Sequence, residues 1–460
     1  MIKKRFLATA LSGVLAASVF LAGCSGEESG KSAGGSKDGE TIELSLMLTP
    51  QWKGVMDSSE QGADYDSFFK HAAEKFSEQY KEHDVKVNVE VIASDQRDEL
   101  LNVKLNGGTP PDIFFESTFA MGDYAHRGAL VPLNDIVEED AKKDIAQNYW
   151  DSVTFGEDIY FYPFSHMPGT LSYNADMFKE AGLEQYIGDE NEIKTWTLEE
   201  YETILKTLKS KLPKDSYPMG LYALNNQGDT WNLAYLRMFG NEFFDKKGNI
   251  ILGDEKGAKA AEWLKKTYDA GLSNPGAESV SSNDVLAMFK NQKIAIAFTN
   301  SVLFNNTKAE MNEGKAPKFD IRLANIPSES GDPLTFTYVS GAAVFNTGDE
   351  TRIKVSKDFV KFFSTDPELI KASKNGVPVR TSVVDEFKSE NPLFEAYDKN
   401  APYLFNFTGS VPGYSELRQA LYPELQALYT GQKSPEQAVK DYEKNGNRII
   451  KEAKDNSAIE

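Results

Sequence analysis

Polar and aromatic side chains follow several predicted strands at positions where they could bind a small molecule. The alternating stretch 41–48 predicts a half-buried strand, and Trp52 follows shortly after it. Glu116 and Ser117 follow a short buried strand, and Asn300 follows an apolar strand. Because ligands of open α/β sheets bind beyond the carboxyl ends of strands, these residues are candidate ligand contacts. Trp52 is either such a contact or a cap on the local core, and the sequence leaves both open.

Motifs that would indicate catalysis or a metal centre are missing from the sequence. The four histidines, His71, His83, His126 and His166, show no HExxH or other paired metal spacing. No G-x-S-x-G elbow is present, and no G-x-G-x-x-G follows a strand. The 70 Asp and Glu residues leave a glycosidase-like carboxylate pair open, but nothing marks one. The residues therefore indicate binding, with no metal and no cofactor.

The stretch 156–174 combines aromatic, Gly and Pro residues in a pattern typical of a link between domains. A β-rich aromatic run, 159–164, is interrupted by Pro163 and leads into a loop with His166 and Met167. A second strand is expected from about residue 171. A chain that leaves one sheet for another often has this strand, kink and strand order, and the loop side chains suit a pocket. A hairpin buried in a single core fits the same residues and stays open.

The size and charge of the chain limit its architecture and its partners. Its 460 residues are too many for one core, which predicts two or three domains. The formal net charge of −20 argues against nucleic acid or an anionic membrane surface as a partner, and is compatible with a neutral ligand. The 28 Phe, 20 Tyr and 5 Trp residues supply abundant flat apolar surface. The single cysteine, Cys24, excludes an intrachain disulfide.

The N-terminus has the pattern of a secretion signal. A basic start, 1–5, precedes the apolar stretch 6–22. The sequence LAGC that ends at Cys24 resembles a bacterial lipobox, which implies a signal peptide at 1–23 and a lipid on Cys24. A transmembrane anchor fits less well, because the apolar stretch is short and interrupted by polar residues. With the flexible linker of 24–40, this predicts an exported protein, lipid-anchored to the outer face of the bacterial cell membrane.

Strand and helix patterns alternate after the linker. Residues 41–115 follow a β-α-β-α-β order, which predicts a parallel sheet covered by helices. After residue 174 the alternation begins again with a capping box at Thr197 and Glu200. The further expected elements are a helix at 255–270, strands at 293–299 and 336–345, helices at 350–363 and 414–429, and a last helix with Ser434 as N-cap and Pro435 at its first position. These patterns indicate two α/β bodies.

Short segments spread along the chain together resemble the extracellular solute-binding proteins of ABC importers, in the carbohydrate-binding class that includes maltodextrin-binding protein. Besides the lipobox, the segments that carry this likeness are VNVEV at 87–91 followed by Asp95, GGTPPDI at 107–113, GALVPL at 128–133, YPF at 162–164, YN at 173–174, TWT at 195–197, FKNQKIAI at 289–296 and GVPVR at 376–380. The likeness covers nearly the whole mature chain.

The resemblance implies an α/β, two-lobe periplasmic-binding-protein-like fold of class II. Each lobe would be a mostly parallel sheet flanked by helices, with three crossings between the lobes: the stretch 156–174, near Phe298 and near Tyr338. The N-terminal lobe would comprise 41–157 plus 299–338, and the C-terminal lobe 158–298 plus 339–460.

The resemblance also implies a cleft between the lobes that closes over a ligand by hinge motion. Carried onto this sequence, the ligand-binding residues are Trp52, Glu116, Ser117, His166, Met167, Asp229, Trp231, Asn300, Tyr338 and Tyr414. We expect Trp231 and Tyr414 to stack on sugar rings. Asp229 and Glu116 are expected to bond hydroxyl groups. Glu116 and Met167 differ from the aromatic and acidic residues at these places in the maltodextrin prototype, which argues against maltodextrin itself.

The expected function is capture of a carbohydrate, favouring an oligosaccharide, and its delivery to the permease of an ABC importer. The protein would act as a monomer without enzymatic activity. The same fold with a non-sugar ligand, such as a peptide, polyamine or metal chelate, is the main alternative. An exported polysaccharide-active enzyme and a surface adhesin are less favoured. Arg380 is either a ligand clamp or a surface charge, with a slight preference for the latter.

Overall fold

A computed structural model describes residues 41–50, 64–93, 96–224, 228–407 and 411–459. All of them belong to one compact unit, Glu40–Glu460. The predicted lipid site, Cys24, and the predicted ligand contact Trp52 lie outside the described residues.

The first part of the chain forms a parallel sheet covered by helices, as its pattern predicts. The central strand β1, Ile42–Leu48, pairs in parallel with β2, Val85–Val91, and with β3, Ile113–Ser117. The helices α1, Ser67–Gln79, and α2, Arg97–Asn106, connect these strands. α1 buries one apolar face, which explains why this segment folds as a surface helix. The strands end together, so the polar residues beyond them gather at one edge.

The second part repeats this design with other elements. The fully buried strand β9, Ile294–Asn300, pairs in parallel with β8, Tyr217–Met219, and β10, Ile321–Ala324, pairs in parallel with β7, Ile193–Lys194. The predicted capping box is present: Thr197 accepts from the backbone of Glu200, and Glu200 accepts from that of Thr197, at the start of α7. The helices of this part include α6 Ala175–Ala181, α7 Leu198–Lys211, α8 Asp229–Leu236, α9 Glu255–Asp269, α10 Ser282–Lys290 and α11 Ser301–Asn312.

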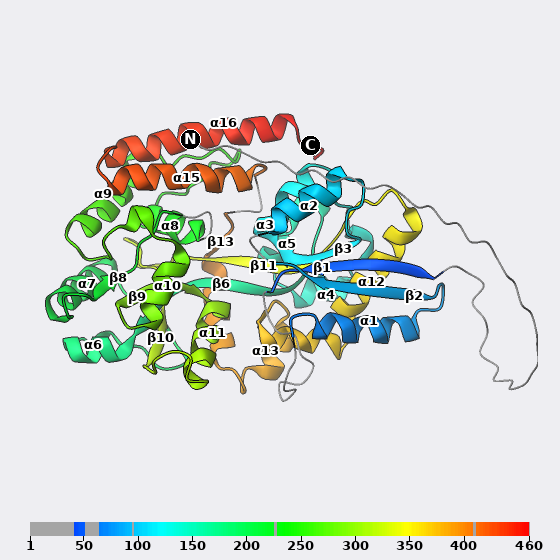
Figure 1. The fold of residues 1–460 in the computed structure, drawn as a ribbon, viewed down its shortest axis with the longest axis horizontal. Helices are drawn as coiled ribbons and strands as arrows, with labels where there is room; N and C mark the ends of the chain where they lie inside the picture. The colour runs from blue at the N-terminus through cyan, green and yellow to red at the C-terminus, as the bar shows by residue number, and fades with distance from the viewer. Residues whose placement is uncertain (1–40, 51–63, 94–95, 225–227, 408–410, 460) are drawn as a thin grey trace, which may run out of the picture. The chain divides into compact units, whose positions relative to one another are not determined.

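The predicted kink in the stretch 156–174 is wrong, because β6 runs unbroken over Tyr162–Asn174. Its first half pairs with β11, Thr335–Val344, and its second half with β9 and β10. Figure 1 shows β6 and β11 side by side through the middle of the structure. Pro163 is tolerated because it lies opposite Gly341, where the register shifts. Pairing along the whole strand overrides the local tendency of Gly and Pro to break it.

Two hydrophobic clusters fill the unit. One contains residues of β1 to β3 and the start of β6; the other contains the end of β6 and the elements that pair with it. Side chains of 299–338, such as Phe304, pack in the second cluster, while Val344 and Phe359 pack in the first. This grouping is the reverse of the predicted lobe assignment for 299–338 and for the segment that contains Val344 and Phe359. The reason is that β10 pairs with the end of β6, while β11 pairs with β3. The domain boundaries themselves stay a prediction.

The last third of the chain is mostly helical, as expected. Its longer helices are α12 Glu350–Thr365, α13 Thr381–Phe387, α14 Leu393–Asn400, α15 Tyr414–Tyr429 and α16 Pro435–Asp455. α15 and α16 pack side by side (Figure 1). Asp123, on α3, Thr118–His126, accepts hydrogen bonds from the backbone of Gly413 at 2.8 Å and Tyr414 at 3.2 Å. This carboxylate therefore caps α15 from a helix of the other hydrophobic cluster.

Candidate functional site

A cavity of about 340 Å³ lies where residues of both hydrophobic clusters meet. Its volume is within the usual range for small-molecule sites. The lining residues that carry polar or aromatic groups are Thr49, Arg97, Asp98, Glu116, Ser117, Phe119, Tyr222, Trp231, Ser282, Asn283, Phe298, Asn300, Tyr338 and Arg418. They come from the ends of β1, β3 and β9, from the middle of β11, and from the first turns of α2, α3, α8, α10 and α15.

Six of the ten predicted ligand-binding residues line this cavity. They are Glu116, Ser117, Met167, Trp231, Asn300 and Tyr338. His166, Asp229 and Tyr414 are buried beside it without lining it, and Trp52 lies outside the described residues. The strand-end rule found Glu116, Ser117 and Asn300, because β3 and β9 end at the cavity.

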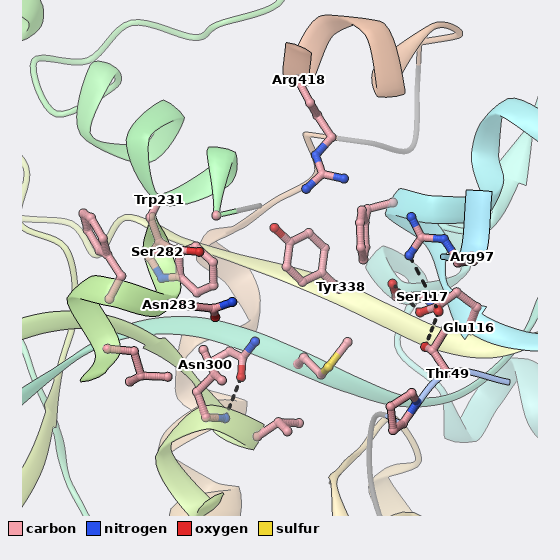
Figure 2. Close-up of a pocket in the computed structure, with 18 of the residues that line it drawn as sticks. Thr49, Arg97, Glu116, Ser117, Trp231, Ser282, Asn283, Asn300, Tyr338 and Arg418 are labelled. Atoms are coloured by element: carbon pink, nitrogen blue, oxygen red, sulfur yellow. Dashed lines mark hydrogen bonds and ion pairs between the residues drawn. The ribbon is translucent and has the colours of Figure 1, made fainter. Parts of the chain in front are cut away.

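One end of the cavity is built around Glu116, which is 2% exposed. The Thr49 hydroxyl donates to Oε2 of Glu116, and the Ser117 backbone N–H donates to Oε1 at 2.7 Å. Arg97 lies on the same carboxylate, with Nη1 at 3.8 Å from Oε2, and its Nε donates to Asp98 at 2.9 Å. Figure 2 shows the contacts of Thr49 and Arg97 with Glu116. Both oxygens of Glu116 and the guanidinium of Arg97 are therefore engaged within the protein.

The other end is built around Asp229, which is 1% exposed and opens α8. The Tyr414 hydroxyl donates to Oδ2 of Asp229, and Nε of Arg418 donates to Oδ1 at 2.8 Å. Tyr414 and Arg418 are four residues apart on α15, so they lie on the same face of that helix. Asp229 and Tyr414 bond with each other and do not line the cavity, so the expected hydroxyl bond of Asp229 and the expected ring stacking of Tyr414 stay predictions. Their place in the cavity is taken by Arg418.

Trp231 lines the cavity with only a small part of its surface, since it is 6% exposed. Its indole N–H lies 3.1 Å from the carbonyl oxygen of Thr299 and 3.3 Å from that of Thr170. The ring packs edge-on against Phe336, with centroids 5.2 Å apart. The indole is thus fixed by β6, β9 and β11 before any ligand arrives.

Tyr338 and Phe119 form an aromatic wall between the two ends. Their ring centroids are 4.9 Å apart, and Figure 2 shows the Tyr338 ring in the middle of the view, below Arg418 and to the left of Arg97. Both guanidiniums lie against Phe119, at 5.2 Å for Arg97 and 4.8 Å for Arg418, in cation–π contacts. The Tyr338 hydroxyl bonds with Thr230, and burial, with Asp229 nearby, raises the pKa of Tyr338. The phenol therefore stays protonated.

The chain matches the family model for bacterial extracellular solute-binding proteins over residues 59–368. The chain belongs to this family. A binding protein of Brucella abortus is 22% identical over 375 residues, which cover 80% of this chain and 86% of that protein. The arabinooligosaccharide-binding protein of Bacillus subtilis is 23% identical over 348 residues, covering 74% of this chain and 72% of that protein.

Among solved structures, the solute-binding protein is similar to the cyclic α-maltosyl-1,6-maltose binding protein from Arthrobacter globiformis. The TM-score is 0.71 at 19% identity, over 90% of this chain and all (100%) of that one. At this identity the likeness shows the fold, which is the predicted two-lobe α/β class.

His166 of the solute-binding protein lies in β6, next to the cavity residue Met167, and is 2% exposed. Its Nε2 bonds with the Tyr149 hydroxyl at 3.1 Å and its Nδ1 with the Thr337 hydroxyl at 2.9 Å. Burial lowers the pKa of His166 to about 3, so the imidazole is neutral. Its hydrogen bonds tie β6 to Tyr149 and to Thr337 of β11, and it does not line the cavity.

Arg380 is neither of the predicted alternatives. It is 8% exposed, bonds with Asp144 at 3.1 Å and with the Ser364 carbonyl at 2.7 Å, and does not line the cavity. A loop position in the sequence does not show that Asp144, 236 positions earlier, and the Ser364 carbonyl enclose the side chain.

Sequence reasoning missed Arg97, Phe119 and Arg418, which all line the cavity. Each sits in the first turn or two of a helix, so no strand-end signal marks it. Within the described ranges, no group of three or more His, Cys, Asp or Glu is arranged to hold a metal ion. No helix there combines the length and apolar character needed to cross a bilayer.

Proposed function

We propose that this protein captures a carbohydrate, an oligosaccharide in particular, in the cavity and delivers it to the permease of an ABC importer. The observation that carries the proposal is the lining itself: an aromatic wall of Tyr338 and Phe119 lies between two polar ends. Aromatic faces stack on the apolar C–H face of a pyranose, and side-chain amides, hydroxyls and guanidiniums bond its oxygens. A relative from Bacillus subtilis binds arabinooligosaccharides according to its name, which supports the same ligand class.

Within this proposal, Tyr338 and the edge of Trp231 contact sugar rings, while Ser117, Asn300 and Glu116 contact hydroxyl groups. Asn300 accepts a hydrogen bond from the Leu303 backbone at 2.9 Å through Oδ1, so the amide N–H₂ is the group it offers to a ligand. Trp52 remains a proposed contact on its place after the first predicted strand and on the resemblance.

Isothermal titration calorimetry on the purified chain tests this function. The panel contains arabinotriose, β-1,4-galactotriose and maltotriose, with spermidine and a neutral tripeptide for the non-sugar alternative. We expect saturable heat with at least one sugar, and an accompanying rise in Tm, because a ligand that binds only the folded state stabilises it. Binding of spermidine or the tripeptide alone would favour the alternative.

The absence of enzymatic activity is part of the proposal. Among the described residues, Asp98 and Glu116 are the carboxylates that line the cavity, and both already contact Arg97. Incubation with the bound sugar should therefore produce no new reducing ends. Sustained release of reducing ends would identify an enzyme.

Lipid anchoring at Cys24 follows from the lipobox resemblance. Cells that express the protein and grow with an alkyne-tagged palmitate analogue should label the wild type and leave Cys24→Ala unlabelled. Equal labelling of the two would contradict the anchor. Delivery to a permease is tested by uptake of the bound sugar, which should fall when the gene for this protein is removed.

A further inference from the structure

Arg418 directs its two terminal nitrogens, Nη1 and Nη2, at the cavity. Its side chain is 10% exposed, and its Nε is bound to Asp229 at 2.8 Å. Among the described residues, none accepts a hydrogen bond from Nη1 or Nη2. Arg418 lies on α15, and Figure 2 shows its guanidinium extending toward Tyr338, with its terminal nitrogens leading. A nearly buried guanidinium whose two terminal nitrogens open onto a cavity is a site for a ligand's acceptor atoms.

The surrounding residues hold this guanidinium in one orientation. Asp229 fixes Nε, the Tyr414 hydroxyl fixes the other oxygen of Asp229, and the ring of Phe119 lies 4.8 Å from the guanidinium carbon. Burial alone would lower the pKa of Arg418, but Asp229 and the neighbouring tyrosines raise it, so the charge is permanent. Because the side chain of Arg418 is already held in place, binding a ligand costs little further side-chain entropy. Hydrogen bonds to its terminal nitrogens therefore contribute more to the affinity.

The charge around the cavity shows which acceptors fit. Three carboxylates, Asp98, Glu116 and Asp229, stand against two guanidiniums, Arg97 and Arg418, in the cavity lining and directly behind it within the described residues. Arg418 is already neutralised by Asp229, and Arg97 by Asp98 and Glu116. A ligand carboxylate would therefore meet an excess of one negative charge and would lose its hydration without a free cation to replace it. Hydroxyl and ring oxygens carry no such cost.

We propose that Arg418 is a specificity-determining residue that binds two oxygens of a neutral sugar through Nη1 and Nη2, and that the cavity discriminates against acidic sugars such as uronates. This inference rests on the proposed function. It adds the charge class of the ligand and the residue that selects for that class.

The test measures calorimetric affinities of the purified full chain for neutral and acidic partners of the same sugar. The probes are maltotriose and β-1,4-galactotriose, each beside its form with C6 oxidised to the carboxylate, and arabinotriose as a further neutral sugar. We expect the wild type to bind a neutral sugar and to bind an acidic form at least about tenfold more weakly.

Arg418→Lys keeps the positive charge for Asp229 but cannot offer two further donors in a fixed fork. We expect its affinity for the neutral sugar to fall about tenfold or more. The matched control is Arg380→Lys, since Arg380 is also buried and paired with an aspartate but does not line the cavity; it should bind as the wild type does. Melting curves of both variants without ligand show whether each is folded.

The outcomes separate the two proposals. If the wild type binds a sugar and Arg418→Lys binds it equally well, the role of Arg418 is overturned while the function stands. Equal or tighter binding of the C6-carboxylate forms overturns the preference for neutral sugars, again with the function intact. A wild type that binds no sugar of the panel contradicts both.

Discussion

The two ends of the cavity hold the same pair of chemical groups in opposite arrangements. At one end Arg97 is engaged by Asp98 and Glu116, and Glu116 is further bonded by Thr49 and Ser117. At the other end each oxygen of Asp229 accepts a hydrogen bond, one from Tyr414 and one from Arg418, but the two terminal nitrogens of Arg418 have no acceptor among the described residues and open onto the cavity. The groups of a buried ion pair can thus bond mainly within the protein, or one of them can keep N–H groups that face a ligand site. The difference depends on which atoms face inward, not on which residues are present.

The largest change is expected from breaking the Asp229 end. Asp229→Asn removes the charge that compensates Arg418 and gives Tyr414 and Arg418 an amide in place of a carboxylate. Removing one partner of a buried ion pair costs about 3–5 kcal/mol, so the free energy of unfolding in urea should fall by about that amount. Sugar affinity should fall as well, because Arg418 loses its support.

Asp144→Asn is the control for this variant. Asp144 pairs with Arg380 away from the cavity, and its side chain is 21% exposed. Asp144→Asn should lower the free energy of unfolding by about 1 kcal/mol and leave the sugar affinity unchanged. Equal losses of stability in the two variants would contradict the special role of the Asp229 end.

An acid-dependent loss of stability is expected from His166, which is buried in β6 and does not line the cavity. In the unfolded chain the imidazole binds a proton near its ordinary pKa of 6.5, whereas burial lowers the folded pKa to about 3. The stabilisation is therefore fully present above pH 6.5 and is lost as the pH falls toward 3, by about 1.4 kcal/mol per pH unit.

Urea unfolding between pH 7 and 4.5 checks this behaviour against His166→Gln, which cannot titrate. The wild type should lose stability more steeply than the variant. The sugar affinity of the wild type should change less over this range than its stability. Parallel stability profiles for the two proteins would show that His166 does not titrate as its burial implies.

The smallest change is expected at the Glu116 end. Thr49→Val removes one hydroxyl that donates to Glu116, while other donors remain, so the free energy of unfolding should fall by about 1 kcal/mol. Thr170→Val is the matched control, because the Thr170 hydroxyl is buried without a hydrogen-bond partner among the described residues. That variant should be neutral or slightly more stable. A larger loss for Thr170→Val than for Thr49→Val would reverse this assignment.

Local patterns were sufficient to predict most of the elements. Alternation indicated β1 and β2, and the capping residues placed the starts of α7 and α16. The local patterns gave a wrong prediction for β6. Its Pro and Gly residues suggested a break, but pairing with β11, β9 and β10 keeps the strand continuous. Local propensity cannot anticipate partners contributed by residues more than a hundred positions later.

The candidate site was predicted in part for the same reason. Glu116, Ser117 and Asn300 lie at the ends of strands, and the strand patterns that lead to them are visible in the sequence. The saturation of Asp229 by Tyr414 and Arg418 joins α8 to a helix far along the chain, at a separation of 189 positions for Arg418. The spacing of four residues between Tyr414 and Arg418 shows that they share a helix face, but not that this face meets Asp229 and the cavity.

A crystal structure of the protein with a bound neutral trisaccharide, chosen from the calorimetric panel, tests the proposed site most directly. We expect two sugar oxygens within about 2.7–3.2 Å of Nη1 and Nη2 of Arg418, with a sugar ring against Tyr338. A sugar bound outside this cavity, or inside it with both terminal nitrogens of Arg418 still unpaired, would contradict the proposal.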